Sequence, residues 1–247
     1  MSSLESAIRI LQCFTPGTPR LRVTELAERL DLPKSTVSRL LKTLSDGGML
    51  DRDEATRQYD AGPVALQLGA LYMAKHSLLD LVDEAVSRLV ERFPFTGYVA
   101  VLDGADAVVL RCRQGGYPLK FVLDIGTRQP AAEAAMGIGL LSQLDETKLE
   151  EALRAGRNAG DNVIPATREA ISHFKREGWV EVPCLAVPGI TAIGSAVLPP
   201  NDREPAIGFS MSFPDAAVDN QKRTEIAREV LTTAQHLTRA ATRLASI

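Results

Sequence analysis

Residues 32–44 read LPKSTVSRLLKTL, and this stretch decides how the N-terminal part of the chain is interpreted. Its apolar residues recur at intervals of three and four, as they do along one face of an α-helix: Val37, Leu40, Leu41 and Leu44. The opposite face carries short hydroxyl side chains and three cations, and no acid lies between Pro33 and Ser45. Such a face suits contact with the phosphates and base edges of a nucleic-acid duplex. The segment is therefore predicted to be a recognition helix.

Two shorter helices are predicted before this segment. Ser2 and Glu5 have the spacing of a capping box, and apolar residues follow at helical intervals as far as Phe14. A second helix is predicted to begin at the N-cap residue Thr24 and to end at residues 31–33. The connection to the third helix is then three or four residues long, which is typical of a helix-turn-helix.

Two short strands, residues 49–52 and 57–60, are predicted after the third helix, around a turn at residues 53–56. A hairpin in this position forms a wing, so residues 1–62 are predicted to be a winged helix-turn-helix domain that binds DNA. The alternative is a three-helix packing module with a solvated polar face. The predicted DNA-binding residues are Lys34, Ser35, Thr36, Ser38, Arg39, Lys42, Thr43, Arg52 and Arg57.

The rest of the chain is predicted to form a linker helix, residues 63–76, and an α+β domain, residues 77–247. The linker helix has a broad apolar side, which we interpret as a packing surface between subunits; packing on its own domain is the alternative. The α+β domain is predicted to hold an antiparallel sheet flanked by helices. Its predicted strands are 98–102, 108–111, 119–123, 191–198 and 206–213, and its predicted helices are 77–93, 130–155, 167–178 and 221 to the end.

The composition is that of an ordinary globular protein. The 247 residues are 45% hydrophobic and 24% charged, and the formal net charge is −3, so nucleic-acid binding has to come from a local cluster of cations. No run of about 18 apolar residues and no signal-like N-terminus is found, so we expect a cytoplasmic protein that binds no membrane. Cys13, Cys112 and Cys184 are far apart and form no CxxC pair, which argues against a disulfide scaffold or a cysteine-rich zinc site.

The chain resembles the IclR (isocitrate-lyase-regulator) family of bacterial transcription factors along essentially its whole length. The resemblance is carried by the order of the elements and by four stretches: residues 32–44, 59–63 (YDAGP), 126–130 (GTRQP) and 210–214 (SMSFP). It implies a cytoplasmic regulator that binds double-stranded operator DNA as a homodimer or as a dimer of dimers. It also implies a C-terminal domain, similar to GAF or PAS sensor folds, that binds a small organic effector.

The resemblance further implies where the effector binds. The site is formed by the loop after the Gly-x-Arg-x-Pro motif, the turn into the strand near residue 191 and two serines of a late strand, with the strand at residues 119–123 as another wall. The predicted effector-binding residues are Leu119, Phe121, Leu123, Ala135, Met136, Thr191, Ala192, Ser210 and Ser212.

This sequence departs from the family pattern at the effector site. The family usually reads His-Ala-Thr-Ala-x-Gly-Lys after the proline, but residues 131–138 contain neither the histidine nor the lysine, and Thr191-Ala192 stands where many members have Arg-Cys. Anionic ligands need cationic or N–H donors. We therefore hypothesise a less anionic, bulkier or more apolar effector, with Met136 and Phe209 in its pocket; the alternative is that these two residues only fill the core.

The sequence predicts no enzyme, metal site or cofactor. His76, His173 and His236 fall in predicted helices without HExxH spacing, and residues 137–139 do not complete a GxGxxG motif. No GxSxG or Walker motif is present. Two alternatives stay open: a redox-sensing regulator that uses Cys112 or Cys184, and a GAF-like enzyme fused to a DNA anchor.

Overall fold

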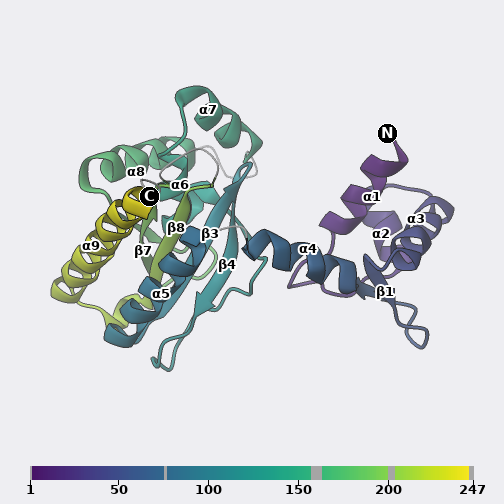
Figure 1. Cartoon of the computed structure of the whole chain (residues 1–247), viewed down its shortest axis with the longest axis horizontal. Helices are drawn as coiled ribbons and strands as arrows, with labels where there is room; N and C mark the ends of the chain where they lie inside the picture. The colour runs from purple at the N-terminus through teal and green to yellow at the C-terminus, as the bar shows by residue number, and fades with distance from the viewer. Residues whose placement is uncertain (1, 75–76, 157–162, 200–203, 245–247) are drawn as a thin grey trace. The chain divides into compact units, whose positions relative to one another are not determined.

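The computed structural model describes residues 2–74, 77–156, 163–199 and 204–244. The chain folds into two compact units, Met1–His76 and Ser77–Ile247. The first unit contains helices and one short hairpin, and the second contains a six-stranded antiparallel sheet with helices packed on it (Figure 1). The fold class is therefore α+β with an N-terminal winged helix-turn-helix, as predicted.

The N-terminal unit is a three-helix module followed by a hairpin and a fourth helix. Its core joins side chains of the first three helices and of the hairpin, all fully or almost fully buried: Ile10, Leu26, Val37, Leu41 and Tyr59. The elements are α1 (Ser3–Gln12), α2 (Val23–Leu30), α3 (Lys34–Asp46), β1 (Leu50–Arg52), β2 (Tyr59–Ala61) and α4 (Pro63–Ala74).

Local capping signals explain where the first helices begin. The predicted capping box of α1 is present: the Glu5 N–H donates to Ser2 Oγ (3.1 Å), and the Ser2 N–H donates to the Glu5 carboxylate (3.2 Å). The prediction for α2 is wrong by two residues, because Arg22 rather than Thr24 is the N-cap and its N–H donates to Glu25 Oε2 (2.6 Å). A three-residue turn then leads from α2 to α3, beginning with Asp31 in the left-handed conformation (φ 52°).

Helix α4 begins directly beside the end of α3. Gly62 is required there, because a Cβ at this position would lie 2.4 Å from the Gly48 carbonyl oxygen. Beyond that junction no side chain of α4 is buried, and Leu66, Leu68 and Leu71 are exposed, Leu66 by 76%. The structure thus does not support packing of α4 on its own domain, which was the alternative interpretation of its apolar side chains.

The C-terminal unit is built on one sheet with the strand order β5-β4-β3-β8-β7-β6, in which all neighbours are antiparallel. The central strands β3 and β8 are adjacent in space although about a hundred residues separate them in sequence. The strands are β3 (Thr96–Asp103), β4 (Asp106–Arg113), β5 (Arg128–Pro130), β6 (Val180–Pro183), β7 (Ile190–Val197) and β8 (Ile207–Pro214).

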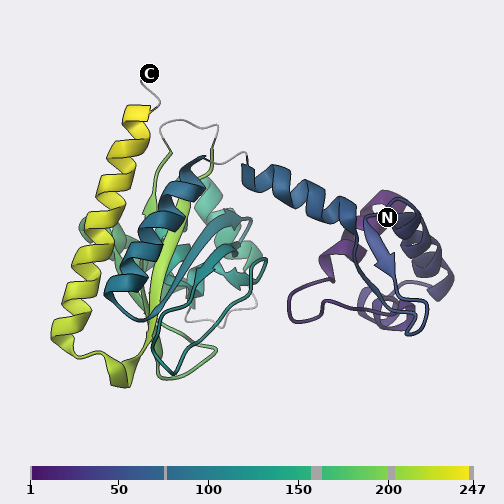
Figure 2. The ribbon, with the colours of Figure 1, turned by 60° about the horizontal axis from the view of Figure 1, so that its bottom comes forward.

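Helices cover both faces of this sheet (Figure 2). One face carries α5 and α9, and the other carries the 3₁₀ helix η1 and helices α6 and α8, with α7 beside them. Gly194 and Gly208 let α6 approach the sheet closely, because a Cβ at either position would lie within 3.0 Å of the α6 backbone. The helices are α5 (Ser77–Arg92), η1 (Ala131–Glu133), α6 (Ala135–Leu141), α7 (Glu146–Ala155), α8 (Val163–Glu177), η2 (Asp215–Ala217) and α9 (Asn220–Leu244).

The predicted third strand, residues 119–123, is wrong. These residues form an irregular segment, held by the Tyr98 hydroxyl, which donates to the Phe121 carbonyl and accepts from the Leu123 N–H. The edge position beside β4 is taken instead by β5 at Arg128–Pro130, which was not predicted, and β6 at Val180–Pro183 was also missed. A side-chain contact from a distant strand therefore overrides the local alternation of apolar residues.

The helical part of this unit also differs in detail from the prediction. The single block predicted for residues 130–155 is three elements, because Ala134 is extended and Asp145 caps a new helix. Helix α8 begins at Val163, so Thr167 lies inside the helix; its buried hydroxyl donates to the Ala132 carbonyl (3.4 Å) instead of capping.

Candidate DNA interface and effector pocket

Helix α3 separates its residues into a buried and an exposed face. Val37, Leu40 and Leu41 are buried, whereas Leu44 is half-buried. Of the nine predicted DNA-binding residues, all but the half-buried Thr36 are exposed. The structure thus leaves the polar face of α3 open to a partner.

The start of α2, the outer face of α3 and the hairpin enclose a groove of about 760 Å³. Four cations line it together with three acids, so its charge is mixed rather than purely basic. Arg22 lines the groove but was not predicted as a DNA-binding residue, because the N-cap of α2 was predicted two residues later, at Thr24. Of the nine predicted DNA-binding residues, Ser38, Lys42, Arg52 and Arg57 line this groove, and the other five lie on α3 outside it. The charged lining residues are Arg22, Lys42, Asp46, Asp51, Arg52, Glu54 and Arg57.

Asp53 organises the tip of the hairpin. Its Oδ1 accepts from the N–H groups of Ala55 (2.8 Å) and Thr56 (3.0 Å), and these bonds lower the pKa of Asp53, with Thr56 as the largest cause. The Arg57 N–H donates to the Asp53 carbonyl (2.7 Å), and Arg57 has a left-handed backbone (φ 57°). A left-handed conformation is costly for most residues other than glycine, asparagine and aspartate, and therefore for arginine.

The cations of α3 and of the hairpin differ in whether they form ion pairs. Arg52 lies 3.5 Å from the Glu54 carboxylate and above the Tyr59 ring, 5.9 Å from its centroid. By contrast, in the described part of the chain none of the remaining predicted cations forms an ion pair: Lys34, Arg39, Lys42 and Arg57.

The second candidate site is a pocket inside the C-terminal unit, between the sheet and the segment from η1 to the start of α6. Its walls combine aliphatic groups with a few polar ones. The pocket measures about 40 Å³, little more than a water molecule occupies. The lining residues are Tyr98, Phe121, Leu123, Gln129, Glu133, Ala134, Ala135, Met136, Val182, Cys184, Ala192, Ser210 and Ser212.

The structure brings together most, but not all, of the residues predicted for this pocket. Phe121, Leu123, Ala135, Met136, Ala192, Ser210 and Ser212 line it, whereas Leu119 and Thr191 do not. Leu119 is exposed, because residues 119–123 are not a strand. Thr191 belongs to the opposite face of β7 from Ala192, and its hydroxyl interacts with Asp215 there. Phe209 is not a lining residue either: it is fully buried and alternates with Ser210 in β8.

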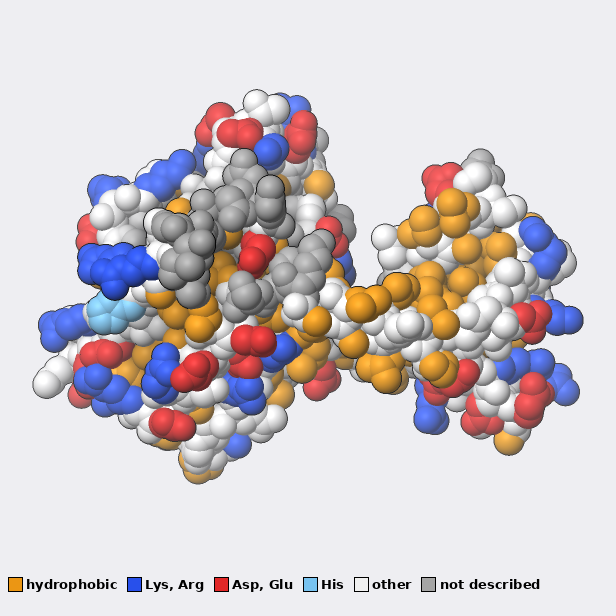
Figure 3. All heavy atoms as spheres, in the orientation of Figure 1, with side chains coloured by type: hydrophobic (Ala, Val, Ile, Leu, Met, Phe, Trp, Pro, Cys, Tyr) orange, Lys and Arg blue, Asp and Glu red, His pale blue; other side chains and the backbone are white. Residues whose placement is uncertain are grey.

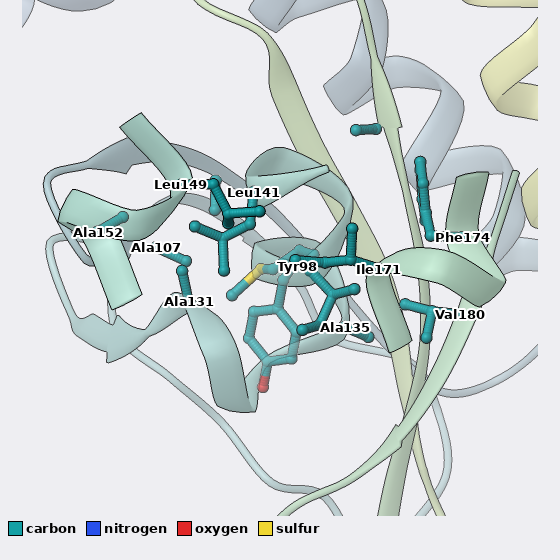
Figure 4. Packing of buried hydrophobic residues seen from close by; sticks show 14 of the residues in the cluster. Tyr98, Ala107, Ala131, Ala135, Leu141, Leu149, Ala152, Ile171, Phe174 and Val180 are labelled. Carbon is teal, nitrogen blue, oxygen red and sulfur yellow. The ribbon is translucent and has the colours of Figure 1, made fainter. Parts of the chain in front are cut away.

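Six lining residues were not predicted: Tyr98, Gln129, Glu133, Ala134, Val182 and Cys184. Tyr98 could have been found by register, since β3 places it directly opposite Ser210 of β8. Its ring belongs to the same core cluster as Ala131, Ala135 and Ile171 (Figure 4). Burial raises the pKa of the Tyr98 phenol far above its usual range, so the hydroxyl is neutral and can donate to the Phe121 carbonyl.

Cys13 and Cys112 do not have the environment of redox-sensing thiols, because burial raises the pKa of both. All three cysteines are half-buried and unpaired with one another. Burial raises the pKa of the Cys112 thiol, and the nearby Asp124 raises it further. A reactive cysteine needs a lowered pKa, because the thiolate is the nucleophile. These observations do not support the redox alternative.

The potential metal ligands among the described residues are not grouped into a site. No group of three His, Cys, Asp or Glu side chains there could hold a metal ion. His173 stacks edge-on against Trp179, with 5.3 Å between ring centroids, whereas His76 lies outside the described residues. Among the described helices, none is both long and apolar enough to cross a bilayer.

Comparison with known proteins places both units in one group. Residues 3–54 match the IclR helix-turn-helix domain, and residues 70–239 match the C-terminal domain of the bacterial transcriptional regulator IclR. The transcriptional repressor IclR of Escherichia coli is 24% identical over 97% of this chain and 90% of its own length. The glycerol operon regulatory protein of Streptomyces coelicolor is 30% identical over 64% of this chain and 62% of its own length.

Solved structures show the same fold. An IclR family transcriptional regulator from Brucella abortus superposes with a TM-score of 0.82 at 21% identity, over 97% of this chain and 92% of the other. An IclR homologue from Microbacterium hydrocarbonoxydans, in complex with 4-hydroxybenzoate, superposes with a TM-score of 0.75 at 19% identity, over 97% of this chain and all of the other.

Proposed function

The chain belongs to the IclR family of DNA-binding transcriptional regulators and is not an enzyme, and from this premise we propose which surfaces bind DNA and effector. Operator DNA binds to the polar face of α3 and to the hairpin. A small organic effector binds in the pocket of the C-terminal unit and changes the affinity for the operator. The observation that carries this proposal is the row of exposed cations on α3 that have no ion-pair partner among the described residues.

Helix α3 enters the major groove in this proposal, and the hairpin lies along the adjacent backbone. Arg39 reads a base edge, because a guanidinium can donate two bonds to one guanine. Lys42 and Arg57 neutralise phosphates, and each is expected to release about one condensed counterion. These roles agree with the exposure of the three side chains.

Two copies of the chain are proposed to bind together, as a homodimer or as a dimer of dimers. Hydrophobic side chains follow α4, where Leu66, Leu68 and Leu71 are exposed (Figure 3). An exposed apolar helix of this kind is stabilised when a second protein surface covers it. Two recognition helices of a dimer reach successive major grooves about 34 Å apart, so the operator should be a pseudo-palindrome.

The effector acts by favouring one arrangement of the DNA-binding domains in the dimer. A ligand that binds two arrangements equally well cannot change their populations. Helix α4 leads from the DNA-binding module towards the effector domain in sequence, so it is the element through which we expect the change to be transmitted.

A binding experiment with three variants tests the DNA interface. Operator sequences are first selected from random duplex DNA with the full-length protein. Arg39→Ala should then lose about 1–3 kcal/mol of discrimination between selected and random DNA. Lys42→Ala should weaken binding to both by the same factor and reduce the salt slope by about one unit. Lys175→Ala in α8, an exposed cation of the C-terminal unit, is the control and should change neither. Equal losses on selected and random DNA for both α3 variants would contradict the assigned roles.

A further inference from the structure

The effector pocket contains a carboxylate but no cation. Glu133 is the only Asp, Glu, Lys, Arg or His side chain among the described lining residues. Building on the function proposed above, we propose that the effector carries a positively charged amino group, which pairs with Glu133, on a compact apolar body.

The carboxylate of Glu133 is unpaired within the described part of the chain. It is half-buried in η1, and no described residue forms an ion pair or hydrogen bond with it. Removing a carboxylate from water without a counter-ion is unfavourable, and a closely placed ammonium group offsets that cost. The pocket is therefore suited to a cationic ligand and would repel an anionic one.

The neighbouring arginine is not available to neutralise Glu133. Arg128 precedes the lining residue Gln129, but successive side chains of a strand point to opposite faces. Its guanidinium pairs instead with Asp103 (2.8 Å) and Asp106 (2.9 Å), which flank the turn between β3 and β4. The arginine closest to Glu133 on its N-terminal side in the sequence is thus paired with other carboxylates.

A second, independent observation indicates a polar ligand. Ser210 lines the pocket and is only 3% exposed, yet its hydroxyl has no hydrogen-bond partner among the described residues. Leaving a buried hydroxyl without a partner is unfavourable, so such groups are normally satisfied by protein, water or ligand. Ser212 and Gln129 also line the pocket without a side-chain partner among the described residues.

The remaining walls limit the size of the ligand. Met136, Leu123 and Phe121 supply apolar surface, and the pocket as it stands is too small for an organic molecule. The segment that carries Phe121 and Leu123 has no regular secondary structure. Among the described residues, its hydrogen bonds to the sheet at Phe121 and Leu123 are those of the Tyr98 hydroxyl. A compact amine is therefore accommodated by an outward movement of this segment.

Three ligands of nearly the same shape test the proposal: benzylamine, benzyl alcohol and benzoate. Binding to the full-length protein is measured by titration calorimetry at pH 7 and low salt. Benzylamine should bind at least about tenfold more tightly than the other two, because a paired charge is worth more than a neutral hydrogen bond. Ligand ranking on the unmodified protein needs no variant, so it stands even where a variant folds poorly.

A pair of matched variants assigns the effect to Glu133. Glu133→Gln should weaken benzylamine binding by at least about tenfold and leave benzyl alcohol binding unchanged. Glu151→Gln removes the same charge from an exposed position of α7 outside the pocket and should bind like the unmodified protein. Ser210→Ala should also weaken benzylamine binding, by a smaller factor.

Several outcomes would overturn the proposal. These are benzoate or benzyl alcohol binding as tightly as benzylamine, no binding of any of the three, or benzylamine binding that is unaffected by Glu133→Gln. The same preparations are tested for binding to the selected operator in a gel. An operator shift without amine binding rejects the ligand class alone, whereas the absence of an operator shift rejects the proposed DNA interface.

Discussion

The basic side chains of the two units differ in their partners. On the polar face of α3 in the N-terminal unit, Arg39 and Lys42 have no ion-pair partner among the described residues. In the C-terminal unit most of the described arginines pair with carboxylates of the same unit, as Arg113 does with Asp83 and Arg128 with Asp103. Ion pairs within a unit connect its helices and strands. Cations without such a partner, such as Arg39 and Lys42, are available to bind an anion from another molecule. The distribution of partners therefore says more about function than the net charge of −3.

The ion pair between Asp83 of α5 and Arg113 of β4 provides the largest expected effect. Its removal tests whether ion pairs stabilise the C-terminal unit. Asp83 is buried, its side chain 10% exposed, and it accepts two hydrogen bonds from Arg113 while lying 3.3 Å from the Arg111 guanidinium. Asp83→Ala should lower the free energy of unfolding by about 3 kcal/mol, because it leaves two arginines without their shared partner. Chemical denaturation of the full-length protein measures the change.

The neighbouring residue supplies the control for that measurement. Glu84 also pairs with an arginine, Arg88, at 2.6 Å, but both side chains are exposed. Glu84→Ala should cost less than about 0.5 kcal/mol, because solvent screens an exposed ion pair. Similar losses for Asp83→Ala and Glu84→Ala would show that burial does not determine the strength of these pairs.

The Tyr98 hydroxyl, at the proposed effector pocket, is a buried polar group whose hydrogen-bond partners belong to the protein itself. Tyr98→Phe removes the donor to the Phe121 carbonyl and the acceptor of the Leu123 N–H. We expect a loss of about 1–2 kcal/mol in stability, in the range of a buried hydrogen bond with its partners left behind. Hydrogen exchange should become faster at the Leu123 amide.

Tyr117→Phe is the matched control, since the same hydroxyl is removed from a half-buried ring that packs on Phe95. It should leave exchange at Leu123 unchanged. Unchanged exchange in Tyr98→Phe as well would mean that the segment around residues 119–123 is held by other contacts.

Local patterns account for what could be predicted from the sequence. The face of α3 follows from its 3.6-residue period, and the capping box of α1 from two residues. The segment at residues 119–123 alternates like a strand, but its conformation depends on Tyr98, a contact that no local pattern contains. Thr191 was misplaced because a shift of one residue in a strand moves a side chain to the other face.

The carboxylate in the effector pocket was missed for a related reason. Glu133 lies in a three-residue 3₁₀ helix, which has no periodicity to reveal its direction. Gln129 lies in a strand that was not predicted at all. Both residues enter the pocket only because the sheet and α6 converge there, and convergence of this kind depends on the tertiary fold.

Substitution of Arg57 is expected to have the smallest effect on the free energy of unfolding. It also separates the stability of the hairpin from the proposed contact of the hairpin with DNA. The left-handed backbone of Arg57 (φ 57°) is unfavourable for an arginine and free of strain for a glycine. Arg57→Gly should therefore leave stability unchanged or raise it by up to about 1 kcal/mol. The same variant should bind the selected operator more weakly, with a salt slope smaller by about one unit.

Arg57→Asn completes this test, since asparagine tolerates the left-handed conformation but carries no charge. It should match Arg57→Gly in DNA affinity and salt slope. A stability loss in both variants would show that the arginine side chain supports the hairpin fold. A loss of operator affinity without any loss of stability would instead mean that the protein keeps a strained arginine at the hairpin tip for its charge.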